Sequence, residues 1–288
     1  MATHFHSLKV KEVKRETPDC VSVSFVVPAD LTEIFSFKEG QNITIKKNIR
    51  GEEVRRSYSV CNAPFEKELR VAIKKTTGGL FSSFANDELK AGDSLEIMPP
   101  IGRFNAKTET GNYLAIAAGS GITPIISIIK HTLKTNLQSN FTLIYGNKSR
   151  GSIIFFEEIE ALKNKFMERF TCVNILSREK TDAEINYGRI GTKKLEGLQH
   201  LMNFKTFNDA FICGPEEMIF ASAAFLEGIG MAKKNIHFEL FTTPGQKKLA
   251  VGNEQLEEEK DNGPKSNITI KLDGRSFNFD LPTRLKTF

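Results

Sequence analysis

Cysteine is scarce in this sequence, with four residues in 288, at Cys20, Cys61, Cys172 and Cys213. Their spacing contains no C-x-x-C pair and does not form the closely spaced set of a small disulfide-rich domain. The spacing therefore argues against a zinc site and against a disulfide framework. We expect four reduced thiols.

Long hydrophobic runs are also missing. The longest apolar stretch, residues 113–129, is interrupted by glycines, Ser120, Thr123 and Pro124, whereas a membrane helix needs about 20 mostly apolar residues in succession. The first ten residues contain no apolar core behind a basic flank, so no secretory signal is visible. The sequence predicts no membrane span and a cytoplasmic location.

Neither sign of charge is in strong excess. Forty Lys and Arg residues against 35 Asp and Glu residues give a formal net charge of +5. A positive balance of this size suits an anionic ligand, but it is spread too evenly along the chain to indicate a nucleic-acid partner. The length of 288 residues predicts two domains, because one compact domain usually has about 100 to 200 residues.

The first part of the chain, residues 1–108, alternates apolar and polar residues in short segments. Examples are VSVSFVV from Val21, NITIKK from Asn42 and LRVAIKK from Leu69, each bounded by turn residues. Period-two alternation of this kind is typical of half-buried antiparallel strands. Closure of the sheet removes its exposed edges, so we predict an antiparallel β-barrel domain.

The pattern changes in residues 109–242. Continuous apolar segments such as YLAIAA from Tyr113 and FTLIYG from Phe141 alternate with helical segments such as the one from Glu216. Apolar strands separated by helices are the signature of a parallel sheet that is covered on both faces. The sequence predicts an α/β domain with a doubly wound parallel sheet.

The last part of the chain is polar and then alternating. Residues 243–266 contain few large apolar residues and are predicted to form a flexible linker. In residues 267–288, Asp273-Gly274 separates two alternating runs, which predicts a β-hairpin with a type I′ turn. Phe277 and Phe279 are expected to share one face of this hairpin.

Two groups of residues in the first domain suggest a binding site. The sequence Arg56-Ser57-Tyr58-Ser59 lies on a predicted strand, where Arg56 and Tyr58 point to one face. The segment GGLFSSF follows from Gly78, and its glycines would admit a phosphate to the N-terminus of a helix that begins near Leu80. Each feature alone is common in ordinary structure, and their combination is what favours a ligand.

The second domain offers residues at the carboxyl ends of its predicted strands. The segment AAGSGITP, from Ala117, provides a tight turn, with Thr123 as expected helix N-cap and Pro124 as the first helical residue. Ser177-Arg178 and Cys213-Gly214 follow two further strands. In an open α/β sheet ligands bind at this edge, although each segment alone also fits a plain strand-to-helix turn.

Taken together, R-x-Y-S, GG-L-F-S-S, G-S-G-I-T-P, L-I-Y-G-N, S-R-E and I-C-G-P resemble the ferredoxin-NADP reductase superfamily over about residues 5–241. Within it, FHSLKV, LAIAAGSGITPIISII, AFICGPEEM and HFELFTTPG are most similar to the reductase subunits of phenylacetyl-CoA epoxidase systems, which serve phenylacetate catabolism. The resemblance implies FAD in the first domain and NADPH in the second. These relatives also carry a C-terminal [2Fe-2S] ferredoxin domain, of which residues 267–288 are predicted to be a remnant.

The resemblance also implies roles for individual residues. Catalytic roles fall to Ser59 near the flavin N5 atom, Cys213 beside the nicotinamide, and Glu239. Arg56 would neutralise an FAD phosphate and Tyr58 would lie against the isoalloxazine. The implied FAD contacts are Arg56, Ser57, Tyr58, Ser59, Ala72, Ile73, Lys74, Gly79, Leu80, Phe81, Ser82, Thr123 and Phe241. The implied NADPH contacts are Gly119, Thr123, Gly146, Asn147, Ser177, Arg178, Cys213, Gly214 and Met218.

Ser177 and Arg178 match the pair that receives the 2′-phosphate of NADPH, whereas Glu179 beside them argues for NADH. The predicted function is hydride transfer from NADPH to FAD, then single-electron transfer to an oxygenase component. The alternatives are a reductase for another oxygenase, a stand-alone NAD(P)H diaphorase, and a flavin-binding interaction protein without turnover. No cysteine follows Cys213, so the [2Fe-2S] ligands of the family are absent and no metal site is expected.

Overall fold

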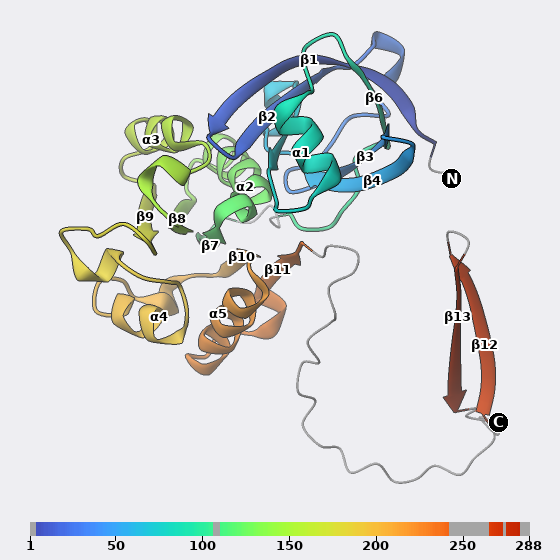
Figure 1. Cartoon of the computed structure of the whole chain (residues 1–288). Coiled ribbons are helices and arrows are strands. Elements are labelled where there is room, and N and C mark those ends of the chain that lie inside the picture. The colour runs from blue at the N-terminus through green and yellow to red at the C-terminus, as the bar shows by residue number, and fades with distance from the viewer. Residues whose placement is uncertain (1–3, 106–109, 242–264, 273–274, 283–288) are drawn as a thin grey trace. The chain divides into compact units, whose positions relative to one another are not determined.

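The computed structural model describes residues 4–105, 110–241, 265–272 and 275–282, the last two ranges by their backbone alone. Contacts divide the chain into two units, Met1–Phe241 and Thr242–Phe288, which are described separately. The first unit contains two sheets that differ in strand direction (Figure 1).

The first sheet is antiparallel and has six strands in the order β4-β3-β6-β1-β2-β5. Their bounds are β1 (His6–Thr17), β2 (Cys20–Val26), β3 (Asn42–Ile49), β4 (Glu52–Ser59), β5 (Leu69–Lys74) and β6 (Ser94–Ile97). Alternate residues such as Leu8, Val23 and Ile45 are fully buried, as the period-two pattern predicts. The predicted antiparallel strands are confirmed.

The two outer strands of this sheet meet and close it. Val60, directly after β4, forms an antiparallel bridge with Val71 of β5. The backbone N–H of Cys61 donates to the Arg70 carbonyl oxygen at 2.9 Å. The closed sheet surrounds an apolar core to which Phe81 of helix α1 (Leu80–Asp87) contributes. The predicted barrel is therefore confirmed.

The second sheet is parallel, with five strands in the order β11-β10-β7-β8-β9. Its strands are β7 (Asn112–Ala118), β8 (Asn140–Asn147), β9 (Phe170–Leu176), β10 (Asp209–Gly214) and β11 (Ile236–Leu240). Its helices are α2 (Ile122–Thr135), α3 (Phe156–Lys165), α4 (Thr192–Leu198) and α5 (Glu216–Gly228).

Helices cover both faces of the parallel sheet. Tyr113 and Ala115 of β7 share an apolar cluster with α2 and α3, whereas Leu114 and Ile116 share one with α4 and α5. Figure 1 shows α2 and α3 on the side of the barrel and α4 and α5 on the opposite side. Strands buried on both faces explain the continuous apolar runs, and the predicted doubly wound α/β fold is confirmed.

One local prediction in the second domain is wrong. A 3₁₀ turn, Gly119–Gly121, follows β7, and α2 begins at Ile122. Thr123 is therefore inside the first helical turn, where its hydroxyl donates to the Ser120 carbonyl oxygen at 3.0 Å, and it does not cap the helix. The chain starts to coil earlier than Thr123 and Pro124 suggest, because the glycine-rich segment itself adopts helical geometry.

Short 3₁₀ helices form several connections in both domains. They are η1 (Ala29–Leu31), η2 (Pro64–Glu66), η3 (Gly119–Gly121), η4 (Arg150–Ser152), η5 (Glu184–Asn186), η6 (Phe204–Thr206) and η7 (Lys233–Asn235).

The second unit contains a hairpin of β12 (Lys265–Leu272) and β13 (Arg275–Pro282). Leu272 pairs with Arg275 in antiparallel register, which confirms the predicted hairpin. Strand β12 begins inside the predicted linker segment, most of which lies outside the described residues, as do the turn residues 273–274 and the side chains of Phe277 and Phe279. The domain boundaries at residues 108, 242 and 266 stay predictions.

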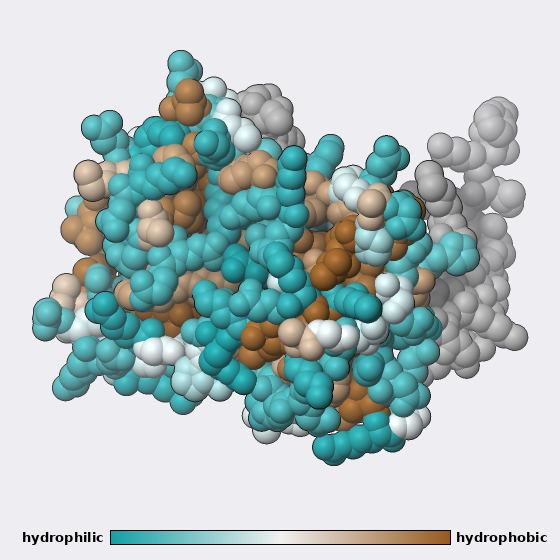
Figure 2. Space-filling model, turned by 90° about the horizontal axis from the view of Figure 1, so that it is seen from above, coloured by the Kyte–Doolittle hydropathy of each residue, from teal (hydrophilic) through white to brown (hydrophobic). Residues whose placement is uncertain are grey.

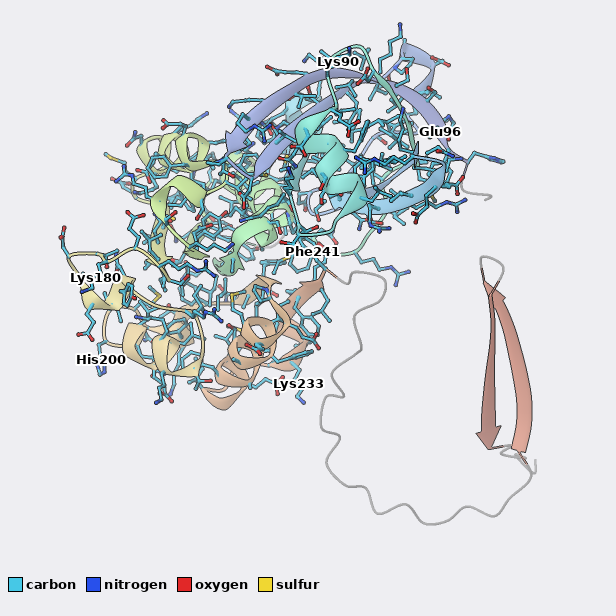
Figure 3. All side chains as sticks on the ribbon, viewed as in Figure 1. Lys90, Glu96, Lys180, His200, Lys233 and Phe241 are labelled. Carbon is cyan, nitrogen blue, oxygen red and sulfur yellow. The ribbon has the colours of Figure 1, made fainter. Side chains whose placement is uncertain are left out.

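The surface of the first unit is mainly hydrophilic on the face that Figure 2 shows, where apolar patches lie between hydrophilic residues. Charged residues such as Lys90, Lys180 and Lys233 project outward from the ribbon (Figure 3). Among the described residues, no helix has the length and apolar character needed to cross a membrane.

Candidate functional site

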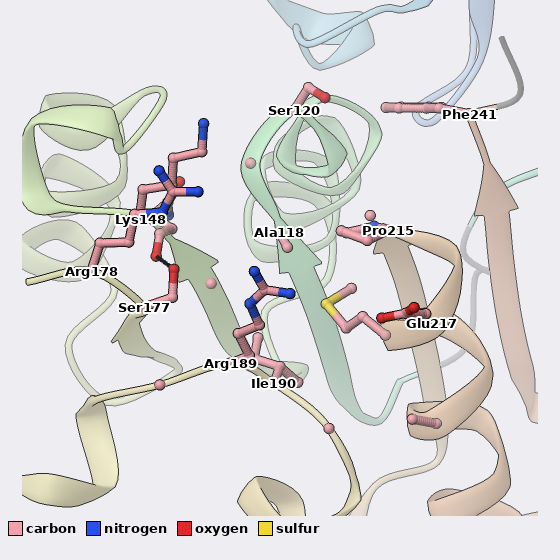
Figure 4. A pocket seen from close by; sticks show the side chains of 18 of the residues that line it. Ala118, Ser120, Lys148, Ser177, Arg178, Arg189, Ile190, Pro215, Glu217 and Phe241 are labelled. Atoms are coloured by element: carbon pink, nitrogen blue, oxygen red, sulfur yellow. Dashed lines mark hydrogen bonds between the residues drawn. The ribbon is translucent and has the colours of Figure 1, made fainter.

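A pocket of about 690 Å³ lies at the carboxyl edge of the parallel sheet (Figure 4). Residues at or just after the ends of β7, β8, β9 and β10 line it. Its lining comprises Lys74, Ala118, Gly119, Ser120, Gly146, Asn147, Lys148, Ser177, Arg178, Gly188, Arg189, Ile190, Gly191, Gly214, Pro215, Glu217, Met218, Ala221 and Phe241. The pocket lies where the topology of an open α/β sheet places ligands.

Two glycines bring backbone segments together at this edge. A Cβ atom on Gly121 would lie 2.1 Å from the Cys213 carbonyl oxygen, so the turn before α2 touches the end of β10. Gly214 has φ +158° and a Cβ atom there would lie 2.7 Å from the Met218 side chain. Both positions need glycine because a side chain would separate the strand ends that form the pocket.

We expect Gly121→Ala to destabilise the fold by about 1–3 kcal/mol, because the new methyl group overlaps backbone that cannot move aside. Chemical denaturation of the purified variant measures this loss. Gly151→Ala is the matched control, since a Cβ atom at Gly151 would meet nothing within 4 Å. Equal stability of the two variants would contradict the steric interpretation.

One end of the pocket is strongly basic. Lys148, Arg178 and Arg189 line it, and Figure 4 shows Lys148 and Arg178 together beside the ends of β8 and β9. The Ser177 hydroxyl donates to the Asn147 carbonyl oxygen at 3.2 Å. This end is suited to a phosphate group, because guanidinium groups bind phosphate oxygens through paired hydrogen bonds.

Glu179, which argued for NADH, has a different partner. Its carboxylate accepts a hydrogen bond from the Arg150 backbone N–H at 2.9 Å, at the start of η4. Glu179 is not among the residues that line the pocket. The carboxylate therefore does not oppose an anion in the pocket by direct contact.

Asn147, the last residue of β8, supplies a test of whether a polar ligand fits. Its side chain is 7% exposed and lines the pocket. Within the part of the chain that the structure describes, neither its amide nitrogen nor its amide oxygen makes a hydrogen bond of good geometry, although the amide lies beside the Tyr145 phenol. Buried polar atoms are nearly always satisfied, so this amide favours a ligand with donors and acceptors, as a nucleotide has.

The other end of the site joins the barrel to the parallel sheet. The Ser59 hydroxyl, at the end of β4, donates to the Glu239 carboxylate of β11 at 3.2 Å. Glu239 pairs with Cys213 in the parallel register of β10 and β11. The structure thus brings the three predicted catalytic residues together, and Phe241 follows at the rim (Figures 3 and 4).

Burial favours the protonated forms of Glu239 and Cys213. It raises the pKa of the Glu239 carboxyl above its ordinary value, an effect that hydrogen bonds from Ser59 and Asn42 partly offset. Burial also raises the pKa of the Cys213 thiol well above its ordinary value, and the nearby Glu239 charge adds to this. Cys213 is therefore a neutral thiol at physiological pH, which does not suit a nucleophilic role.

We expect Glu239→Gln to raise the free energy of unfolding at pH 8, measured by thermal unfolding of protein freed of flavin. The folded protein binds the Glu239 proton more tightly than the unfolded chain, whose pKa is near 4.5. Stability of the wild type therefore falls as pH rises from 4.5 through the raised pKa. Glutamine cannot ionise and escapes this loss.

The advantage of Glu239→Gln should grow with pH across that window and disappear near its lower end. Glu168→Gln is the control, because Glu168 is exposed. A variant whose advantage did not depend on pH would show that burial does not disfavour the Glu239 carboxylate.

The barrel side of the site carries an aromatic surface beside a cation. Tyr58 packs against Phe81 of α1 with ring centroids 5.7 Å apart. Burial raises the pKa of the Tyr58 phenol well above its ordinary value, and the Arg56 guanidinium acts in the opposite direction. Ser57 is exposed, with its hydroxyl 2.9 Å from that of Thr44. Arg56 and Tyr58 therefore lie close together, as the strand alternation predicts.

A second pocket, of about 270 Å³, lies at the N-terminus of α1. Gly78, Gly79, Leu80 and Arg50 are among its lining residues. The Ser82 hydroxyl accepts from the Thr76 backbone N–H at 3.2 Å, which shapes the turn rather than the pocket wall. A helix N-terminus next to a guanidinium fits the phosphates of FAD.

Two family models match the chain in these two regions. The oxidoreductase FAD-binding domain matches residues 7–106, and the oxidoreductase NAD-binding domain matches residues 115–223. A component of the 1,2-phenylacetyl-CoA epoxidase of Escherichia coli is 42% identical over 277 residues, which span 95% of this chain and 76% of that protein. The chain belongs to the ferredoxin-NADP reductase family. It is an oxidoreductase with FAD- and NAD(P)-binding domains.

Other relatives agree with this family. The ferredoxin reductase component of 3-ketosteroid-9-alpha-monooxygenase from Rhodococcus rhodochrous is 30% identical over 279 residues, covering 96% of this chain and 76% of the relative. The FAD/NAD-binding domain of a Vibrio cholerae nitric oxide dioxygenase superposes with a TM-score of 0.72 at 25% identity, covering 83% and 99% of the two chains.

A ferredoxin-NADP⁺ reductase from Neisseria gonorrhoeae with bound FAD and NADP gives a TM-score of 0.71 at 21% identity, covering 83% of this chain and 99% of that one. At this level of identity the likeness shows that the two proteins share a fold. It adds to the evidence that a barrel followed by a parallel sheet is the arrangement of the family.

The structure places most of the predicted NADPH residues of this family member in one pocket. Those that line it are Gly119, Gly146, Asn147, Ser177, Arg178, Gly214 and Met218. Lys74 and Phe241, expected to contact FAD, also line it, which brings the two predicted cofactor sites together at the domain boundary. Other predicted residues are buried and do not line the pocket, among them Ser59, Ala72, Ile73, Thr123 and Cys213.

Sequence reasoning missed Arg50, Lys148, Arg189 and Glu217, all of which line a pocket. Lys148 follows the strand FTLIYGN directly, so its position at a strand end was a usable signal. Arg189 is preceded by a loop that returns to the end of β9, where Tyr187 bridges Leu176. Its approach to the pocket depends on that loop and has no signal in the local pattern.

Proposed function

We propose that this family member is a reductase that transfers a hydride from NADPH to FAD and passes single electrons to an oxygenase component. The observation that carries the proposal is the contact of Ser59 with Glu239, beside Cys213. It joins the FAD-binding barrel to the nucleotide-binding sheet, and Gly214, the residue after Cys213, lines a pocket that Lys148 and Arg178 also line.

The chain's own residues would hold both cofactors. Arg56, Tyr58 and the N-terminus of α1 are suited to FAD, through charge, aromatic contact and free backbone N–H groups. FAD, when bound, supplies the capacity to accept a hydride and release single electrons. The Ser59–Glu239 pair fixes a hydroxyl at the domain boundary, and the neutral Cys213 thiol shields this end from water.

Preference for NADPH is supported by the charges at the far end of the pocket. Lys148, Arg178 and Arg189 offer three cations where the adenosine end of a dinucleotide would lie if its nicotinamide lay near Cys213. A 2′-phosphate gains charged hydrogen bonds there that a plain hydroxyl does not. The Glu179 carboxylate accepts a hydrogen bond from the Arg150 backbone N–H of η4, so it does not pair with these cations.

The proposed partner is an oxygenase of the phenylacetyl-CoA epoxidase type. The E. coli relative, a component of that enzyme, matches 95% of this chain. A reductase for another oxygenase and a stand-alone diaphorase would use the same site. A flavin-binding interaction protein would need only the barrel, and the pocket at the parallel sheet disfavours it.

Anaerobic stopped-flow mixing tests this proposal. Purified protein reconstituted with FAD should be yellow and should lose its flavin absorbance on mixing with NADPH. The efficiency with NADPH should exceed that with NADH. Protein that stays colourless after FAD is added, or flavin that NADPH does not reduce, would refute the reductase. Equal efficiency with both nucleotides would refute the NADPH preference alone.

We expect this 288-residue chain to contain less than about 0.1 iron atom per molecule, because a plant-type cluster needs four thiolates and no cysteine follows Cys213. Reduction of ferricyanide by NADPH should persist without iron. Iron and sulfide assays with parallel activity measurements check this. Stoichiometric iron and sulfide would contradict it.

A further inference from the structure

Charged side chains join the barrel to the nucleotide-binding domain on the side of helices α2 and α3, and they range from the buried Lys130 to Glu66, whose side chain is 30% exposed. Arg70 of β5 donates to both carboxylate oxygens of Glu158 of α3 at 3.0 Å. Lys130 of α2, which is 5% exposed, pairs with Glu158 and, at 3.2 Å, with Glu66 of η2. We call these four residues the joint.

The charged groups of the joint have further partners besides one another. The Arg70 Nε atom donates to the Asn62 amide oxygen at 3.0 Å, and its guanidinium lies 5.3 Å from the Phe155 ring centroid. Glu66 also accepts from the Ala63 backbone N–H at 2.6 Å. Each charged group of the joint has more than one partner, and charged hydrogen bonds of this kind depend on geometry, so the joint should favour one relative placement of the two domains.

A hydrogen bond next to the joint makes the connection tighter. The Ser127 hydroxyl of α2, which is fully buried, donates to the Asn62 carbonyl oxygen at 2.5 Å. The Cys61 thiol donates to the Arg70 carbonyl oxygen at 3.2 Å. The stretch between β4 and β5 is thereby fixed both to the barrel and to α2.

The elements that the joint connects are those that carry the site. On the barrel side, Asn62 follows Ser59 by three residues, and Arg70 shares β5 with Lys74. On the other side, α2 starts at the glycine turn of the pocket. A shift at the joint would therefore move Ser59 relative to Glu239 and Cys213, and with them the two cofactor sites.

We propose that Glu158 and Ser127 are positioning residues for hydride transfer, acting through the joint to hold the nicotinamide at its reacting distance from the flavin. The inference rests on the proposed function, because hydride transfer is the step that it concerns. Misplacement of reacting groups by 1 Å can cost about 10²-fold in rate, so a modest loosening has a measurable effect.

The first experiment compares Glu158→Gln with Glu160→Gln, using anaerobic stopped-flow reduction by NADPH. Glu160 is two residues along the same helix, and its ion pair among the described residues is with Lys163 of that helix. We expect Glu158→Gln to lower the limiting rate of flavin reduction on the order of tenfold, with FAD content and NADPH dissociation constant within about threefold of wild type. Glu160→Gln should reduce at the wild-type rate.

A second pair removes a neutral group and avoids an uncompensated buried charge. Ser127→Ala should slow flavin reduction about fivefold. Ser222→Ala, which removes an equally buried hydroxyl without a hydrogen-bond partner among the described residues, should not.

Hydrogen exchange on flavin-free protein gives a readout that does not depend on turnover. Peptides covering residues 60–70 and 122–131 should exchange at least about threefold faster in Glu158→Gln and Ser127→Ala than in the two controls.

These results separate failure of the inference from failure of the proposed function. Flavin in the wild type that NADPH does not reduce refutes the function and the inference with it. Wild-type reduction together with unchanged limiting rates in Glu158→Gln and Ser127→Ala refutes the inference alone. Slower reduction that comes only from lost FAD or weaker NADPH binding also refutes it, because a positioning residue affects the rate of the bound complex.

Discussion

Ser59→Ala is expected to lower the limiting rate of flavin reduction by NADPH about 10²-fold while FAD remains bound. The variant loses the hydrogen bond that joins β4 to the Glu239 carboxylate at 3.2 Å. It also leaves a buried carboxylate with one fewer donor, although burial already disfavours its charge. Single-turnover reduction in a stopped-flow spectrometer, with FAD content from the absorbance ratio, measures both effects.

Cys213→Ala should also lower the limiting rate of flavin reduction while FAD remains bound. We expect a smaller effect, about tenfold, because the neutral thiol contributes packing rather than charge. Arg56→Ala should instead lose FAD, because the family resemblance assigns its guanidinium to an FAD phosphate.

Matched controls separate catalysis from stability in these variants. Ser24→Ala removes another buried barrel hydroxyl, one without a hydrogen-bond partner among the described residues, and Cys172→Ala removes a half-buried thiol of β9. Both should keep wild-type reduction rates. If Ser59→Ala and Cys213→Ala also reduce FAD at the wild-type rate, their side chains are structural and the proposed centre is wrong.

Arg178→Ala is expected to lower kcat/KM for NADPH by about 10- to 100-fold and to change kcat/KM for NADH by less than about twofold. Only the 2′-phosphate loses a charged contact, so the effect should appear mainly in KM. Steady-state kinetics with both nucleotides at one ionic strength measures it, because surface charge effects depend on salt.

Arg150→Ala is the control for this variant. Arg150 is an exposed cation near the pocket whose side chain lies 4.8 Å from the Phe156 ring centroid, and it does not line the pocket. If Arg178→Ala acted only by lowering the net positive charge, Arg150→Ala would lower kcat/KM for NADPH by the same factor. An equal fall in NADH efficiency in Arg178→Ala would show that Arg178 contacts a part that the two nucleotides share.

The sequence by itself determined the kinds of secondary structure and their order. Alternation in NITIKK and continuous apolar character in YLAIAA reflect one buried strand face in the barrel and two in the parallel sheet. Such burial is a local periodic property, so it can be read along the chain. The strand-end segments with Ser177-Arg178 and Cys213-Gly214 followed from the same pattern, because parallel strands end at a common edge.

The tertiary structure decided which distant residues meet. Ser59 and Glu239 are 180 positions apart in the sequence. The family resemblance assigned both residues to one site, and the structure shows the hydrogen bond between them. The entry of Arg189 and Lys148 into the nucleotide pocket, and the pairing of Arg70 with Glu158, depend on strand order, loop path and domain docking. No periodic pattern encodes these contacts, because they arise when separately folded surfaces pack together. That packing is also what makes the charge of Glu239 costly and the geometry of the joint specific.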